Sequence, residues 1–146
     1  MTTDIVTEAQ AYWDRIRRDR VMPGRADLDP VDIPKLLPFV MLVEVLRNPL
    51  DFKFRLIGDE IIAIIAHNYR GMLFSQIPHM AAGNGMWQQY AEVAKTGRPL
   101  VSSVSYVGPD RYVRSLRHCL LPLSADGQIV STIFAALAIR RAAPPP

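Results

Sequence analysis

Three histidines and one cysteine are the side chains of the sequence best suited to ligating metals or attacking substrates, namely His67, His79, His118 and Cys119. None of them stands at a paired-ligand spacing such as CxxC or HExxH. His118 and Cys119 are adjacent in an expected strand, so their side chains point to opposite faces and cannot share one metal ion. The sequence therefore indicates no metal site, and we interpret Cys119 as a small buried residue rather than a reactive thiolate.

The sequence offers little equipment for catalysis. It contains no GxSxG nucleophile motif, and Gly83-Asn84-Gly85 lacks the lysine and the preceding strand of a phosphate-binding loop. Between Asp59-Glu60 and Glu92 there is no carboxylate at all, which leaves few groups for acid–base chemistry. We therefore expect no enzymatic activity and assign no catalytic residue.

A set of aromatic and other large side chains could instead line a binding site. Their alternative role is to form the ordinary core, which is the commoner fate of such residues. Arg55 has two possible roles: a salt bridge with Asp14 or Glu8, or a clamp for a carboxylate or phosphate. The candidate ligand-binding residues are Phe54, Arg55, Tyr69, Met72, Phe74, Trp87, Tyr90 and His118.

An amphipathic helix is predicted at the N-terminus, from Asp4 to Arg20, and Met22-Pro23-Gly24 ends it. Its apolar stripe needs a cover, so the helix either folds back on the domain or pairs with a second copy of itself. We expect dimerisation through this stripe, which consists of Ile5, Ala9, Tyr12, Trp13 and Ile16.

Strand patterns and helix patterns follow in a definite order. After a short helix that starts at Asp29-Pro30, two strands over residues 39–46 and 51–58 form a predicted hairpin, with Phe52, Phe54 and Leu56 on one face. Short helices are predicted over 59–66 and 86–95, the second ended by Gly97. Three further strands are predicted over 100–107, 112–121 and 128–139.

This order predicts one α+β domain. Five antiparallel strands would form the sheet, with short helices on one face and the N-terminal amphipathic helix in addition. We expect residues 1–21 to form that dimerising or capping helix, residues 22–141 to form the domain, and the proline-rich residues 142–146 to be a disordered tail.

Composition restricts the class of protein further. Hydrophobic residues make up 49% of the chain and charged residues 21%, which is typical of a globular domain. No apolar run is long enough to span a bilayer and the N-terminus does not resemble a secretory signal, so we expect a cytoplasmic protein without membrane contact. The net charge of +3 comes from scattered arginines, which we interpret as a solvated basic face, and a nucleic-acid partner is not indicated.

Several short segments that run through most of the chain form a recognisable series. They include Tyr12-Trp13, Asp29-Pro30, Leu36-Leu37-Pro38, residues 54–58, residues 120–124 and Asp126-Gly127. In their order and spacing these segments resemble a family of stand-alone bacterial PAS-domain proteins of the alphaproteobacterial type. The resemblance implies a PAS fold, a sensory or interaction role and a tendency to dimerise through the N-terminal helix. It implies no catalytic residue and no particular ligand, and the output would come from another protein.

The two cofactors common in PAS domains are not supported by the sequence. Haem-binding members use a histidine on the long helix that faces the sheet, but residues 86–95 contain none and His79 is the nearest candidate. Photoactive flavin members need a cysteine in the short helices, and residues 59–80 contain none. The sequence therefore identifies no cofactor.

The leading hypothesis is a non-enzymatic, homodimeric sensory module that binds a small apolar or aromatic ligand or a signalling partner protein. One alternative is an adaptor that binds anions or nucleotides through its surface arginines. The other is a small enzyme of the cone-shaped NTF2-like fold, which would place an ionisable set of residues inside its cavity.

Overall fold

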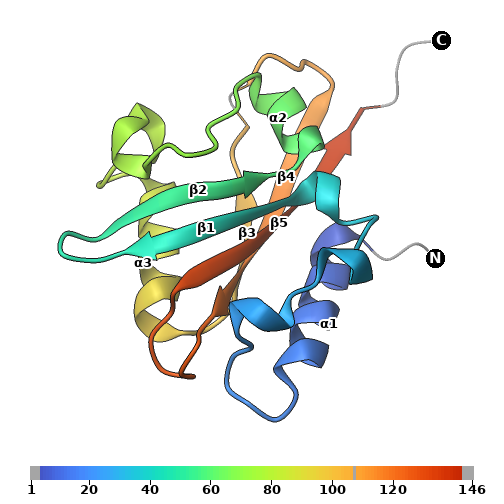
Figure 1. The fold of residues 1–146 in the computed structure, drawn as a ribbon. Helices are drawn as coiled ribbons and strands as arrows, with labels where there is room; N and C mark the ends of the chain where they lie inside the picture. The colour runs from blue at the N-terminus through green and yellow to red at the C-terminus, as the bar shows by residue number, and fades with distance from the viewer. Residues whose placement is uncertain (1–3, 107, 143–146) are drawn as a thin grey trace.

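The computed structural model describes residues 4–106 and 108–142, and its centre is a five-stranded antiparallel sheet (Figure 1). The strand order β2-β1-β5-β4-β3 joins an N-terminal hairpin to a C-terminal three-stranded meander. The predicted α+β fold is confirmed. Of the predicted tail, only Ala142 lies within the described residues. The strands are β1 (Val40–Leu46), β2 (Asp51–Ile57), β3 (Leu100–Val104), β4 (Val113–Leu123) and β5 (Thr132–Arg141).

Three α-helices accompany the sheet: α1 (Ile5–Arg17), α2 (Asp59–Ile65) and α3 (Gly85–Thr96). The carboxylate of Asp4 caps α1 by accepting from the Thr7 N–H at 2.8 Å. The helix ends three residues earlier than predicted, because Arg18 adopts a positive φ of 60°. At the end of α3, Gly97 takes the left-handed conformation and donates to the Val93 carbonyl, as the sequence predicts.

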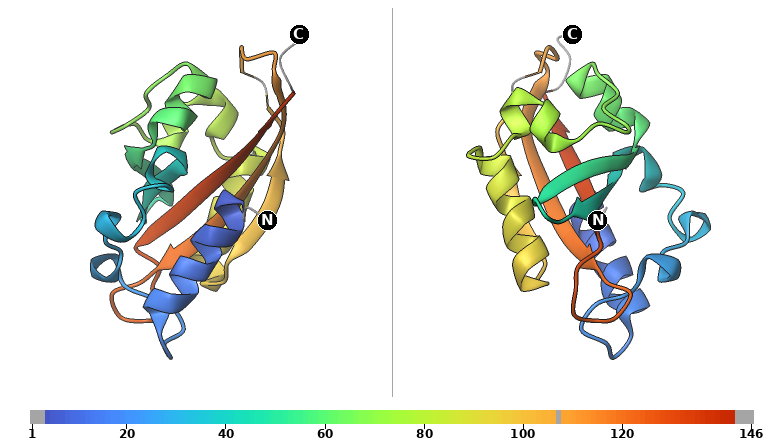
Figure 2. Two further views of the ribbon diagram at one scale, coloured as in Figure 1. Left: turned by 90° about the vertical axis from the view of Figure 1, so that its right-hand side faces the viewer. Right: turned by 60° about the vertical axis from the view of Figure 1, so that its left-hand side comes forward.

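Helices α1 and α3 lie on opposite faces of the sheet (Figure 2). Two neighbouring residues of β4 show this directly, since Arg117 pairs with Asp4 at the start of α1 while His118 bonds to Gln89 of α3. Successive side chains of a strand point to opposite faces. We call the face covered by α3 the inner face and the face covered by α1 the outer face.

The N-terminal helix folds back on its own sheet. Ala9, Tyr12 and Trp13, three of the five residues predicted for dimerisation, are buried within the chain, whereas Ile5 and Ile16 are half-buried. The Trp13 indole N–H donates to the Pro122 carbonyl at 2.8 Å. A dimer that used this face would therefore require α1 to leave its own sheet, and the dimer stays a prediction.

A β-bulge interrupts the pairing of β1 with β2. Leu42 faces Leu56 and Val43 faces Phe54, so Arg55 is an extra residue without a partner on β1. The bulge breaks the two-residue alternation of β2. The prediction that Leu56 shares a face with Phe52 and Phe54 is therefore wrong: Leu56 is half-exposed on the outer side of the hairpin.

Within the described part of the chain, no helix combines the length and the apolar character that crossing a membrane would take.

Candidate functional site

An aromatic cluster fills the space between α3 and the inner face of the sheet. Phe52 is at its centre, with its ring centroid 5.2 Å from Phe74, 5.0 Å from Trp87 and 5.7 Å from Tyr90. Phe54 extends the cluster from the same strand, 4.8 Å from Phe74. Tilted and edge-to-face rings at these distances pack favourably. Phe52, Phe74 and Tyr90 are fully buried, so side chains rather than open space occupy this interior.

The Tyr90 hydroxyl is the one fully buried polar side-chain atom of this cluster that has no partner among the described residues. It is the single fully buried side-chain nitrogen or oxygen for which the described residues provide no hydrogen bond. Burial raises the pKa of this phenol above its ordinary value, so the hydroxyl keeps its proton at neutral pH. An unsatisfied buried hydroxyl costs about 1–3 kcal/mol. A bound molecule with a polar atom at this point would remove that cost.

A second polar group on the inner face, the imidazole of His118, does have a hydrogen-bond partner. His118 Nε2 lies 2.6 Å from Gln89 Oε1, and Gln89 Nε2 donates to the Ser102 hydroxyl at 3.2 Å. The amide oxygen can only accept, so Nε2 of the neutral imidazole carries the proton. Burial lowers the pKa of His118 to about 4, which keeps the ring neutral at physiological pH. These bonds fasten α3 to β3 and β4.

The two remaining histidines both lie beside the ring of Tyr69. His79 is exposed in the turn that precedes α3, with its ring centroid 6.2 Å from that of Tyr69, and His67 stacks on Tyr69 with centroids 5.5 Å apart. Cys119 is buried, and burial raises the pKa of its thiol to about 12. Within residues 4–106 and 108–142, no group of three or more histidine, cysteine or acidic side chains is placed to hold a metal ion.

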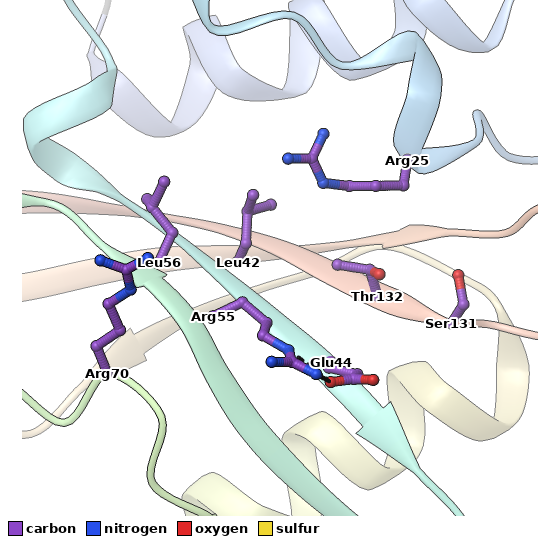
Figure 3. Close-up of a pocket in the computed structure, with 8 residues that line it drawn as sticks. All are labelled: Arg25, Leu42, Glu44, Arg55, Leu56, Arg70, Ser131 and Thr132. Carbon is purple, nitrogen blue, oxygen red and sulfur yellow. Dashed lines mark hydrogen bonds and ion pairs between the residues drawn. The ribbon is translucent and has the colours of Figure 1, made fainter.

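The outer face carries a different feature, a hollow of about 510 Å³ over β1 and β2 (Figure 3). Three guanidinium groups line it, from Arg25 in the turn after α1, Arg55 in the bulge of β2 and Arg70 in the loop after α2. The rest of the lining is Leu42, Glu44, Leu56, Ser131 and Thr132. We call this hollow the arginine hollow.

Arg55 forms its salt bridge with Glu44 on the neighbouring strand, where the Arg55 Nε lies 2.6 Å from the Glu44 carboxylate. The expected pairing of Arg55 with Asp14 or Glu8 is therefore wrong. Asp14 instead pairs with Arg17 on its own helix, at 2.7 Å. The sequence alone could not identify Glu44 as the partner of Arg55, because the contact between these two residues depends on the register of the hairpin.

The comparison with family models gives one match, to the family described as PAS domain, over residues 1–138. The chain belongs to the PAS domain family. No curated protein matched the sequence, and no solved structure matched the fold. The five-stranded sheet is consistent with this family, whose domains generally have a sensory or signalling role.

This PAS domain divides the predicted ligand-binding residues between two places. Phe54, Phe74, Trp87 and Tyr90 meet in the aromatic cluster, and Tyr69 stacks on Phe54 with centroids 6.1 Å apart. Met72, His118 and Arg55 complete the prediction. Met72 packs against the core, and its backbone carbonyl accepts from the Phe54 N–H. His118 contacts α3 through its hydrogen bond with Gln89. Arg55 faces the opposite side of the sheet.

Three residues of this PAS domain contribute to the aromatic cluster, to the bond with His118 or to the arginine hollow, but were not predicted as site residues. Phe52 is the centre of the aromatic cluster, and its alternation with Phe54 in β2 was the signal that could have assigned it. Gln89 carries the bond to His118 and lies next to Tyr90 on α3. Glu44 is the only acid of the arginine hollow among the residues described, and no local pattern marks it.

Proposed function

We propose that this PAS domain is a sensory or signalling module that binds a small, mainly apolar or aromatic ligand between α3 and the inner face of the sheet. The observation that supports the proposal most directly is the buried Tyr90 hydroxyl without a partner among the described residues, on a ring that packs against Phe52 and Phe74. Most of the wall is aromatic and one polar atom is free. This combination is typical of sites that bury an apolar ligand and orient it by a single hydrogen bond.

Binding at this place requires movement. The side chains of the cluster are closely packed, so a ligand must shift α3 or the turns before it to gain room. A ligand that binds the opened arrangement better shifts the population toward it by its differential affinity. Because Gln89 joins α3 to Ser102 and His118, the shift would alter the contacts of β3 and β4. This is the physical route by which we propose that the signal leaves the site.

The proposal assigns a binding role rather than a catalytic one. His118 and Cys119 are buried with their pKa values moved so that both stay neutral near pH 7, and the phenol of Tyr90 stays protonated. Groups whose pKa lies far from the working pH are inefficient general acids and bases, and a thiol that keeps its proton is a weak nucleophile. The proposal further includes a homodimer and a partner protein that supplies the output. Light scattering at twice the 16.4 kDa chain mass would support the dimer.

Native mass spectrometry of the protein purified without denaturant tests the ligand proposal. We expect a species heavier than the chain by the mass of one small molecule. Addition of that molecule to stripped protein should move the amide resonances of β2 and α3, which carry Phe52 and Tyr90, and leave the N-terminal half of α1 unchanged. Resonance changes confined to the outer face would contradict the proposal.

A further inference from the structure

The arginine hollow is built from three separate parts of the chain. Arg25 reaches over the sheet from the turn after α1, and Arg70 comes from the loop after α2 on the other side of Leu42 and Leu56 (Figure 3). Arg55 comes from the bulge of β2. Three remote segments that bring the same chemical group to one hollow form a more specific arrangement than a run of arginines on one helix.

The bulge in β2 is the local cause of the hollow's composition. In a regular strand, Arg55 and Leu56 would point to opposite faces, but the extra residue turns both toward the outer face, where both line the hollow. One position therefore supplies a charge and the next supplies apolar surface. Bulges are common beside binding sites because they redirect side chains in this way.

The charge of the hollow is strongly unbalanced. Its lining has three guanidinium groups against the single carboxylate of Glu44, a formal excess of two positive charges. Glu44 engages Arg55, whereas within the described chain neither Arg25 nor Arg70 has a carboxylate at salt-bridge distance. Exposed guanidinium groups without a carboxylate partner, such as those of Arg25 and Arg70, bind phosphate oxygens well, because their planar donors match that geometry.

The remaining walls indicate what accompanies the phosphate. Leu56 is partly exposed and offers apolar surface for a flat ring, with the buried Leu42 beneath the hollow, and Ser131 and Thr132 offer hydroxyl groups beside it. A volume of about 510 Å³ is in the range of sites that bind small molecules rather than single ions. A second basic hollow, at Arg114, Arg140 and Arg141, has neither leucines nor contributions from a third segment, so it lacks these walls.

We propose that the arginine hollow binds a phosphorylated small molecule of nucleotide size, with its phosphate on Arg25, Arg55 and Arg70 and its ring over Leu42 and Leu56. This site is separate from the interior ligand site proposed above, and a negative test of one site leaves the proposal for the other unchanged. Glu44 competes with the ligand for Arg55, so the site is weakest while that salt bridge is intact.

Calorimetric titration of the full chain with AMP, adenosine and inorganic phosphate tests the site. We expect AMP to bind at least about tenfold more tightly than either of the other two, because only AMP engages the arginines and the leucines together. AMP binding should weaken as NaCl increases. Equal affinity for AMP and adenosine would overturn the proposal. So would binding of a phosphoserine peptide with no measurable binding of AMP.

Substitutions locate the site. Arg25→Gln and Arg70→Gln should each lower the affinity for AMP by about tenfold, while Glu44→Gln should raise it by freeing Arg55. The matched control is Arg98→Gln, which removes the same charge at an exposed position beyond α3 and should leave the affinity unchanged. All four residues are at least partly exposed, and thermal melting verifies that each variant folds. An AMP affinity that falls equally in the control and in the two arginine variants would contradict the assignment.

Discussion

The indole N–H of Trp13 donates to the carbonyl of Pro122 over 2.8 Å, and this buried bond joins α1 to β4 across 109 positions of sequence. Trp13 and Pro122 both lie in segments that carry the resemblance to PAS-domain proteins, Tyr12-Trp13 and residues 120–124. The bond explains why the two segments belong together: one supplies a helix face and the other supplies the strand that receives it. The N-terminal helix is thus part of the core of this domain, and Val6 and Ala9 are fully buried beside the bond.

Replacement of Trp13 should destabilise the whole domain. Trp13→Ala removes a buried ring and a buried hydrogen bond, and we expect the free energy of unfolding to fall by about 3–5 kcal/mol. The exposed Val31 provides a control, since Val31→Ala should change the free energy of unfolding by less than about 0.5 kcal/mol. Urea denaturation measures both. A Trp13→Ala protein as stable as the control would mean that α1 does not pack on the sheet in solution.

The two tyrosines Tyr90 and Tyr106 should respond in opposite directions to loss of the hydroxyl. Tyr90→Phe removes a buried hydroxyl that has no partner, so the ligand-free protein should become more stable by about 1 kcal/mol. Tyr106→Phe removes a hydroxyl that donates to the Ile64 carbonyl at 2.6 Å, and should destabilise by a similar amount. Melting temperatures of the two variants test this. A destabilised Tyr90→Phe protein would show that the hydroxyl has a partner in solution.

The burial of His118 should make stability depend on pH. Its pKa is about 4 in the folded chain and 6.5 when exposed, so the unfolded state binds the extra proton first. The buried neutral imidazole makes its full contribution to the free energy of unfolding above pH 6.5. As the pH falls toward 4 that contribution is lost, by up to about 3 kcal/mol. His118→Gln should flatten this part of the stability curve. If the variant and the parent lose stability equally over this interval, the imidazole is not buried in its neutral form.

The thiol of Cys119 should be unreactive in the folded protein. It is fully buried, and burial raises its pKa to about 12, so almost no thiolate exists at pH 8. We expect alkylation by iodoacetamide only as fast as the domain unfolds, with full reaction in urea. Rapid labelling under native conditions would contradict the burial of Cys119.

The sequence predicted the elements of the fold better than their partners. Proline, glycine and alternation mark the ends of strands and helices, which is why Gly97 and the hairpin of β1 and β2 were predictable. The bulge at Arg55 was not, because a strict two-residue period assigns Leu56 to the inner face. The contact of His118 with Gln89 joins residues 29 positions apart, and only the tertiary fold brings them together.

The N-terminal helix shows the same limit. Its apolar stripe was visible in the spacing of Ala9, Tyr12 and Trp13, but a stripe does not identify the surface that covers it. A sheet of the same chain and a second copy of the helix satisfy the pattern equally well. The choice depends on the geometry of β4 and β5, which no helix periodicity encodes.

The most direct test of the proposed ligand site compares phenol with toluene, two probes of nearly equal shape that differ in one polar group. NMR titration should show phenol binding the interior of the wild-type protein about tenfold more tightly than toluene, because its hydroxyl can pair with Tyr90. In Tyr90→Phe that preference should disappear, as a double-mutant cycle requires for a direct contact. Equal binding of the two probes by the wild-type protein, or a preference that survives in Tyr90→Phe, would contradict the account.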